Sequence, residues 1–109
     1  MVILTVMTGH LYSGLDLCKH LYRDAEGSMR HSRYWHRVMD AIQMPALRVN
    51  SAMFGAVIGT GFEMAAPTHI RVGDRSAFFQ LPERHREIIV CGRGSVRIGC
   101  IQALIRYAI

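Results

Sequence analysis

The clearest hydrophobic pattern in the chain is helical and lies in its first half. Trp35, Val38, Met39 and Ile42 recur at the i, i+3, i+4, i+7 spacing that places apolar side chains on one face of a helix. Pro45 follows, and proline lacks the N–H group that a continuing helix requires. The pattern therefore predicts an amphipathic helix that ends at Pro45.

Two further elements are predicted ahead of this helix. The apolar, β-branched stretch 2–7 is typical of a strand. After a turn over 9–14, Ser13 and Asp16 form a loose capping box, which predicts a helix over about residues 14–25. The first third of the chain is thus expected to contribute a strand and then two helices.

Beyond Pro45 the pattern changes to short apolar runs separated by turn residues. Strands are predicted over 46–49, 52–58, 68–72, 76–81 and 87–91, and 62–65 is expected to return as a hairpin after the Gly59-Thr60-Gly61 turn. This order favours an α+β fold, with a mainly antiparallel sheet of about five to six strands and two helices packed on one face. Residues 1–109 are expected to form a single domain.

The last part of the chain has two interpretations. In the first, Gly92-Arg93-Gly94 is a hairpin turn, and Val96, Ile98 and Cys100 alternate along a final strand. In the second, the glycine-rich segment is a loop that leads into a helix over about residues 98–107. The pattern leaves both open.

The charge adds a candidate surface. The net charge is +5, and all the basic residues except Lys19 are arginines, whose planar fork of donors suits phosphates and carboxylates. The basic residues that we expect to bind an anionic partner are Arg30, Arg33, Arg37, Arg84, Arg86, Arg93 and Arg97. The expected partner is nucleic acid or an acidic or phosphate-bearing protein surface. A solvated face, or a coding bias toward arginine, is the alternative explanation.

One motif suggests chemistry. Cys91 and Arg97 stand in a Cys-x5-Arg spacing with Gly94 between them, after an apolar run. The motif locally resembles the phosphate loop of the Cys-dependent protein phosphatases. The resemblance implies that Cys91 would attack phosphorus and that Arg97 would hold the phosphoryl oxygens. The alternative is a buried strand cysteine beside a glycine-rich turn.

Other site classes receive no support from the sequence. The cysteines are Cys18, Cys91 and Cys100, an odd number without a CxxC pair, and no HExxH motif is present. We therefore predict no metal, no cofactor and a reducing compartment, which is the cytoplasm or the interior of a host cell. No apolar run is long enough to span a bilayer. Seven methionines and the apolar segment 52–62 favour self-association.

Together these patterns favour a small, basic, arginine-rich intracellular protein without catalytic activity, of the kind found as phage or viral accessory proteins. It would grip an anionic partner through its arginines. A minimal Cys-dependent phosphatase that uses Cys91 and Arg97 is the first alternative. A structural subunit of a homo-oligomeric assembly is the second.

Overall fold

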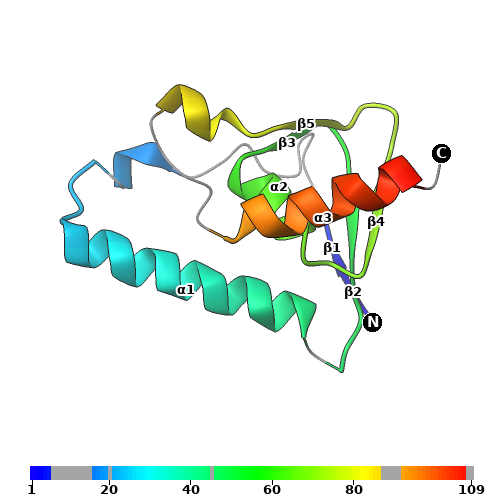
Figure 1. Cartoon of the computed structure of the whole chain (residues 1–109), viewed down its shortest axis with the longest axis horizontal. Helices are drawn as coiled ribbons and strands as arrows, with labels where there is room; N and C mark the ends of the chain where they lie inside the picture. The colour runs from blue at the N-terminus through cyan, green and yellow to red at the C-terminus, as the bar shows by residue number, and fades with distance from the viewer. Residues whose placement is uncertain (6–15, 20, 45, 87–91, 108–109) are drawn as a thin grey trace.

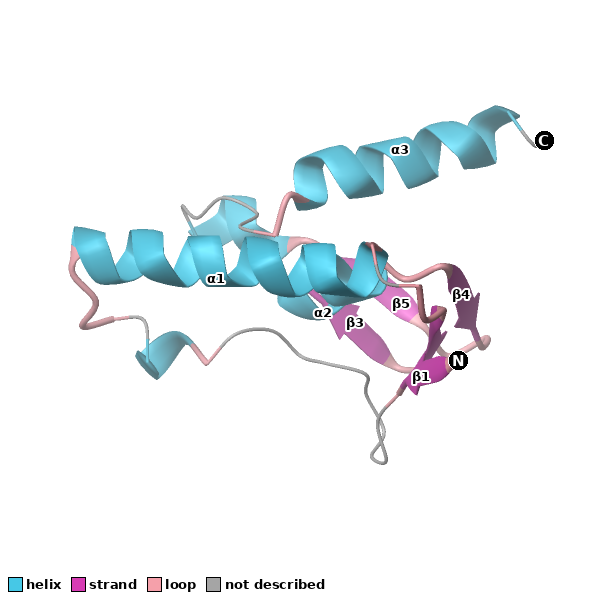
Figure 2. Cartoon of the chain, turned by 90° about the horizontal axis from the view of Figure 1, so that it is seen from below, coloured by secondary structure: helices cyan, strands magenta, loops and turns pink. Residues whose placement is uncertain are grey.

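The computed structural model describes residues 1–5, 16–19, 21–44, 46–86 and 92–107 (Figure 1). The described strands are β1 (Val2–Leu4), β2 (Val49–Met53), β3 (Ala56–Ile58), β4 (Ile70–Gly73) and β5 (Phe78–Gln80). The described helices are α1 (Ala25–Gln43), α2 (Thr60–Ala65) and α3 (Gly94–Tyr107), with short 3-10 helices η1 (Leu17–Lys19) and η2 (Pro82–Arg86). The strands gather at the end of the molecule that holds the N-terminus, and α1 runs along one side (Figure 1 and Figure 2).

Helix α1 confirms the strongest sequence prediction. Asp24 caps its first turn, because the Asp24 carboxylate accepts a hydrogen bond of 2.7 Å from the Gly27 N–H. The helix ends at Gln43, two residues before Pro45, and buries Met39 completely. The helix expected over 14–25 is wrong in its described part, where residues 17–19 form a single 3-10 turn. Its proposed N-cap, Ser13, lies outside the described residues.

All the described strand pairs are parallel, which overturns the antiparallel sheet of the sequence prediction. One sheet has the order β1-β2-β4, with Val2 opposite Val49 and Asn50 opposite Ile70. A second sheet pairs β3 with β5, and Ala56 lies opposite Phe78. Parallel neighbours need crossover connections rather than tight hairpins.

Two local features explain the error. The Gly59-Thr60-Gly61 segment begins helix α2 instead of a hairpin turn, so residues 62–65 are helical rather than a return strand. The turn after β4 does not fold β5 back onto β4. Instead, the Ser76 hydroxyl accepts a hydrogen bond of 3.0 Å from the Gly55 N–H, which directs β5 to lie beside β3.

Asp74 stabilises that turn. Its carboxylate accepts hydrogen bonds from the Ser76 hydroxyl at 2.6 Å and from the Ser76 N–H at 2.8 Å. These bonds, the hydroxyl bond first, hold the pKa of Asp74 below its ordinary value. The route of the chain from one sheet to the other is thus fixed by polar contacts that hydrophobic periodicity does not reveal.

The end of the chain follows the helical interpretation. Helix α3 begins at Gly94, after Arg93, whose φ of 59° is rare for a residue with a side chain. The hairpin interpretation, in which 92–94 turns into a final strand, is therefore wrong. Between the strands expected over 76–81 and 87–91, residues 82–86 form the 3-10 helix η2. The strand expected over 87–91 lies outside the described residues.

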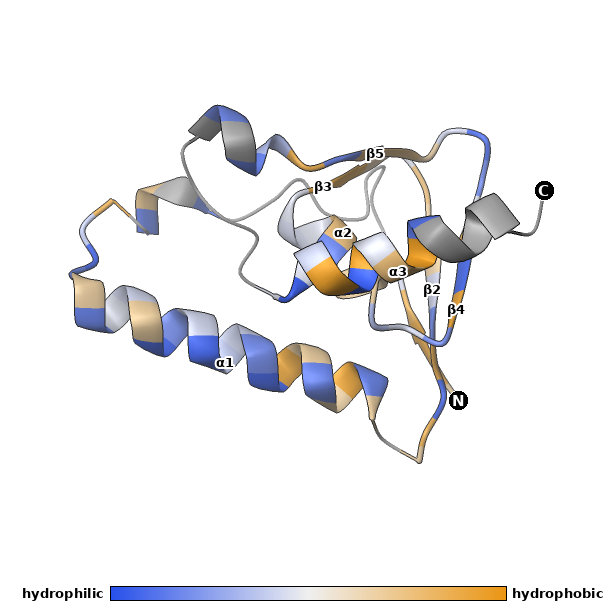
Figure 3. Cartoon of the chain, in the orientation of Figure 1, coloured by the Kyte–Doolittle hydropathy of each residue, from blue (hydrophilic) through white to orange (hydrophobic). Residues whose placement is uncertain are grey.

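The hydrophobic core lies between α2 and the strands. Met53, Val57 and Ala65 form its buried cluster, with Phe62 packed against them. The Phe62 ring also contacts Phe79 of β5, with 5.2 Å between ring centroids. Apolar side chains of β1, β4 and β5 nevertheless remain exposed. Figure 3 colours the ribbon by the hydropathy of each residue. None of the described helices is long and apolar enough to cross a membrane.

Candidate active site

An acidic side chain lies buried at the apolar centre of the molecule. Glu63 of α2 is only 4% exposed. Its Oε1 accepts a hydrogen bond of 2.7 Å from the N–H of Gly92, the residue two positions before α3. Because a buried carboxylate oxygen is costly without a donor, this bond offsets part of the cost of burying Glu63.

Gly92 fits this place because it has no side chain. A Cβ atom at Gly92 would lie 3.1 Å from Oε1 of Glu63 and 3.3 Å from Cγ of Met39. Any larger residue would push the carboxylate or the methionine away. The backbone of Gly92 therefore approaches Glu63 as closely as a hydrogen bond requires.

A second carboxylate lies beside the residue that precedes α2. Glu83 belongs to η2, and its Oε2 is a buried atom for which the described residues provide no hydrogen-bond partner. Its Oε1 lies against Gly59, where an added Cβ would be only 3.0 Å away. Gly59 has a φ of 54°, accepts a hydrogen bond from the Glu63 N–H and directly precedes α2.

Gly59 thus connects the two glutamates, since its carbonyl accepts the Glu63 N–H while the Glu83 carboxylate lies against it. Two glutamates in unlike surroundings, one buried and one with a single buried oxygen, are a typical arrangement for proton transfer, since one can accept a proton while the other donates one. An unpartnered buried oxygen such as Oε2 of Glu83 needs an explanation, and a catalytic role is one. We therefore take these two residues as the candidate active site.

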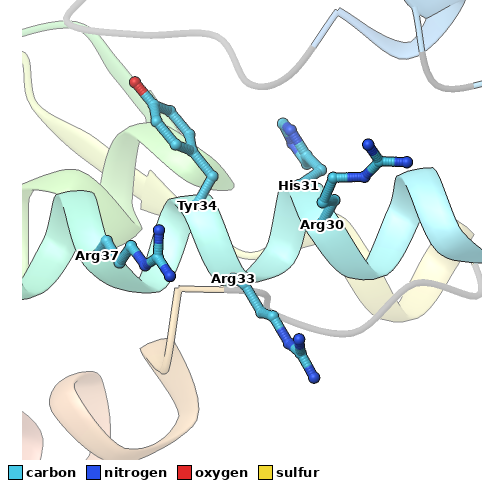
Figure 4. Close-up of a pocket in the computed structure, with 5 residues that line it drawn as sticks. All are labelled: Arg30, His31, Arg33, Tyr34 and Arg37. Atoms are coloured by element: carbon cyan, nitrogen blue, oxygen red, sulfur yellow. The ribbon is translucent and has the colours of Figure 1, made fainter.

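The arginines of α1 lie elsewhere. Arg30, Arg33 and Arg37, with His31 and Tyr34, line a shallow groove of about 470 Å³ that a single helix provides (Figure 4). Figure 4 shows the Arg33 side chain on the opposite side of the helix from the His31 and Tyr34 rings. The lining of the groove includes neither carboxylate of the candidate site.

Arg30 is paired with Glu26 at 3.0 Å on the exposed side of α1. No observation tests whether the groove arginines bind an anion, so that assignment stays a prediction.

Two other predicted arginines meet at one acidic residue. Arg97 and Arg93 lie 2.6 Å and 3.6 Å from the Asp40 carboxylate. Arg97 also donates to Gln43 and to the carbonyl of Gly92, so its fork is occupied by the protein itself. Arg84 and Arg86 fall within η2, and their side chains are not described. Cys91 lies outside the described residues.

The sequence prediction missed both carboxylates. Glu63 is an isolated acidic residue within the apolar run 62–66, and Glu83 follows Pro82 at the end of another apolar run. A charge inside an apolar helix is a signal in itself, because glutamate is almost never buried without a reason. Residues able to hold a metal do not cluster in the described part of the chain, and no group of three such side chains occurs there.

The proteins that resemble this chain are found among solved structures. No protein-family model matches the chain, and no curated protein matches it. Solved structures do match. A provisionally assigned enoyl-CoA hydratase from Rhodopseudomonas palustris has 44% sequence identity and a TM-score of 0.88, over 98% of this chain and 42% of that one.

More distant structures agree in fold. An enoyl-CoA hydratase from Thermoplasma volcanium has a TM-score of 0.83 at 20% identity, over 88% of this chain and 39% of that one. A provisionally assigned enoyl-CoA hydratase from Thermobifida fusca, in complex with acetoacetyl-CoA, has a TM-score of 0.70 at 17% identity, over 97% of this chain and 46% of that one. The chain therefore spans less than half the length of these proteins.

These matches correct the functional prediction. They point to an enzyme rather than to a non-catalytic accessory protein, so the nucleic-acid-binding, viral and structural-subunit interpretations are wrong. The matches also contradict the phosphatase alternative, because the first of them is a hydratase. In addition, the Arg97 guanidinium already donates hydrogen bonds to Asp40, Gln43 and Gly92. In place of the predicted antiparallel α+β sheet, the chain has the fold of the corresponding part of the enoyl-CoA hydratases, the crotonase fold.

Proposed function

We propose that this chain carries the proton-transfer residues of an enzyme that adds water to the double bond of an enoyl-CoA thioester. The observation that carries the proposal is the buried Glu63, whose N–H bonds Gly59, together with Glu83, whose carboxylate lies against the same glycine and has a buried oxygen without a described partner. The 44% identity to the R. palustris protein supports it. The proposed location is the cytoplasm, which the odd number of cysteines supports.

The chemistry explains why two carboxylates are useful. In the addition, water oxygen bonds to the β-carbon, the double-bond electrons move toward the thioester oxygen, and the α-carbon gains a proton. We assign Glu63, whose carboxylate accepts the Gly92 N–H, to remove the proton from water. Glu83 then gives its proton to the α-carbon. Exchange with solvent returns both residues to their starting states, so atoms and charge balance over one turnover.

The thioester oxygen becomes negative during this step and needs hydrogen-bond donors. Thr60 and Gly61 are buried where α2 begins, and the first N–H groups of a helix have no acceptor within it. They are candidate donors for that oxygen. Their position directly after Gly59 places them beside the residue that Glu83 contacts.

The test is hydration of crotonyl-CoA, followed by the loss of ultraviolet absorbance from the conjugated thioester. We expect Glu63→Gln and Glu83→Gln each to lower kcat by about 10²–10⁴-fold, the usual contribution of a positioned acid or base. Glu26→Gln is the matched control, because Glu26 is an exposed glutamate whose described partner is Arg30. It should keep full activity.

Two results would overturn the proposal. One is a wild-type chain that does not hydrate crotonyl-CoA. The other is wild-type turnover by both Glu63→Gln and Glu83→Gln.

We also infer that the chain associates with copies of itself. Strands β1 and β4 form the two edges of one sheet. Ile70 and Val72 of β4 are 58% and 60% exposed, and Ile3 of β1 is 58% exposed. Exposed apolar residues gathered on one sheet are typical of an interface. Light scattering should give a multiple of 12.3 kDa for the wild type.

The variant Ile70→Arg/Val72→Arg should reduce the measured mass to that of one chain. Leu21→Arg, at an exposed leucine outside the sheet, serves as the control and should leave the mass unchanged. A wild-type protein that is monomeric at micromolar concentration would contradict this inference.

A further inference from the structure

Arg97 is a nearly buried arginine whose guanidinium binds three different acceptors. Its side chain is 9% exposed. Its Nη2 donates to Asp40 at 2.6 Å, its Nε donates to Gln43 at 2.8 Å, and its Nη1 donates to the Gly92 carbonyl at 2.5 Å. Two of these acceptors are side chains of α1 and the third is backbone next to the candidate active site. The guanidinium thus connects α1 to the segment that precedes α3.

Gly92 lies between Arg97 and Glu63. Its carbonyl accepts the Arg97 bond, while its N–H donates to Oε1 of Glu63 at 2.7 Å. Gly92 has no side chain of its own to hold it in place, and a Cβ there would displace a neighbour. The direction of the Gly92 N–H therefore depends on how its carbonyl is held.

We propose that Arg97 is a positioning residue for Glu63 and acts through the backbone of Gly92. Asp40 and Gln43 fix the guanidinium, the guanidinium fixes the Gly92 carbonyl, and Gly92 then presents its N–H to the carboxylate. This inference rests on the proposed function, in which Glu63 removes a proton from water. Small misplacements of a catalytic group, on the order of 1 Å, lower rates by about 10²-fold.

A simpler role would be to join α3 to α1. Arg93 separates the two roles, because it also pairs with Asp40, at 3.6 Å, but its side chain is 56% exposed and makes no described hydrogen bond to Gly92. Arg97→Met and Arg93→Met each remove one cation from Asp40. Only the first removes the donor to the Gly92 carbonyl.

The experiment combines kinetics with amide hydrogen exchange by NMR. In Arg97→Met we expect kcat for crotonyl-CoA to fall about 10–100-fold while KM changes less than about twofold. The acidic limb of activity against pH should move to higher pH, because Glu63 must be deprotonated to act as the base and a carboxylate that loses a donor holds its proton more tightly. The Gly92 amide should exchange at least about tenfold faster, because its hydrogen bond opens more often.

Arg93→Met should leave all these readouts at wild-type values. Arg97→Lys retains the charge but cannot supply the same fork of donors, so we expect an intermediate loss of kcat. If Arg97→Met does not fold, the Arg97→Lys variant still tests the positioning role.

The outcomes separate this inference from the proposed function. Unchanged Gly92 exchange and unchanged kcat in a folded Arg97→Met or Arg97→Lys would overturn the positioning role. Equal losses in the Arg93→Met protein would overturn it as well, since they would assign the effect to Asp40 pairing alone. Gly92 exchange needs no turnover, so the contact can be confirmed even if Glu63→Gln retains activity and the proposed function fails. If Glu63→Gln abolishes activity and Arg97→Met changes nothing, the proposed function stands and the positioning role falls.

Discussion

The charged groups of this protein fall into two regions that differ in what their surroundings require. On α1, the Arg30 side chain is 75% exposed and pairs with a neighbour one turn away. In the candidate active site, Glu63 is almost fully buried, and an oxygen of Glu83 is buried without a described partner. An exposed ion pair contributes little free energy in either direction. A buried carboxylate destabilises the fold unless something compensates for it.

This difference indicates which charged residues are the better candidates for a functional role. The arginines dominate the composition, and their number drew the sequence prediction toward an anionic partner. The two glutamates are a small minority of the charges, yet Glu63 is almost fully buried and Glu83 has a buried oxygen without a described partner, both of which cost stability. Residues that oppose stability and are still present are the ones for which activity is the natural explanation.

Among changes that leave both glutamates in place, the largest expected effect comes from closing the space around Glu63. In Gly92→Ala the new Cβ would lie 3.1 Å from Oε1 of Glu63 and 3.3 Å from Cγ of Met39. We expect kcat for crotonyl-CoA to fall about 10²-fold because the carboxylate moves. The free energy of unfolding should fall by about 1–3 kcal/mol, the usual cost of overpacking. Urea denaturation and the hydration assay measure the two effects.

Gly99→Ala is the matched control for this substitution. Gly99 is exposed within α3, and an added Cβ would meet nothing within 4 Å. Because alanine favours a helix over glycine, the free energy of unfolding should rise by up to about 1 kcal/mol. Activity should stay at the wild-type level. If Gly92→Ala behaved like Gly99→Ala, the tight approach of Gly92 to Glu63 would have no functional meaning.

Part of this arrangement could be predicted from the sequence. Helix α1 is predictable, because the spacing of Trp35, Met39 and Ile42 marks the inward face of a single element. The positions of several strands were approximately right for the same reason. The pairing of those strands was wrong, because periodicity within a strand does not say which other strand lies beside it.

The candidate site shows the same limit. In the sequence, Gly59 is typical of a turn. In the structure, its positive φ lets the chain enter helix α2 while the Glu83 carboxylate lies against it. The bond from Gly92 to Glu63 joins residues 29 positions apart, and the bond from Arg97 to Asp40 joins residues 57 positions apart. Arg97 was selected from the sequence, but for a phosphate rather than for the carbonyl that it binds.

The smallest effect is expected from the exposed region, and it sharpens the contrast most directly. We propose that Arg30, Arg33 and Arg37 act on a CoA thioester only by attracting its phosphates from a distance. The triple variant with Gln at these positions should keep the wild-type kcat, and its free energy of unfolding should change by no more than about 0.5 kcal/mol. Its KM should rise about two- to fivefold at low ionic strength and return to the wild-type value at high salt, where charges are screened.

A second triple variant separates position from net charge. Arg23, Arg48 and Arg75 are also exposed, and their replacement by Gln removes the same charge away from the groove. If both variants raise KM equally, the whole positive charge of the chain attracts the substrate and the groove has no special role. If the groove variant alone raises KM, the groove faces the approaching phosphates. A fall in kcat with KM unchanged would place these arginines in the chemistry itself, and the distinction between an exposed region that attracts and a buried region that reacts would be lost.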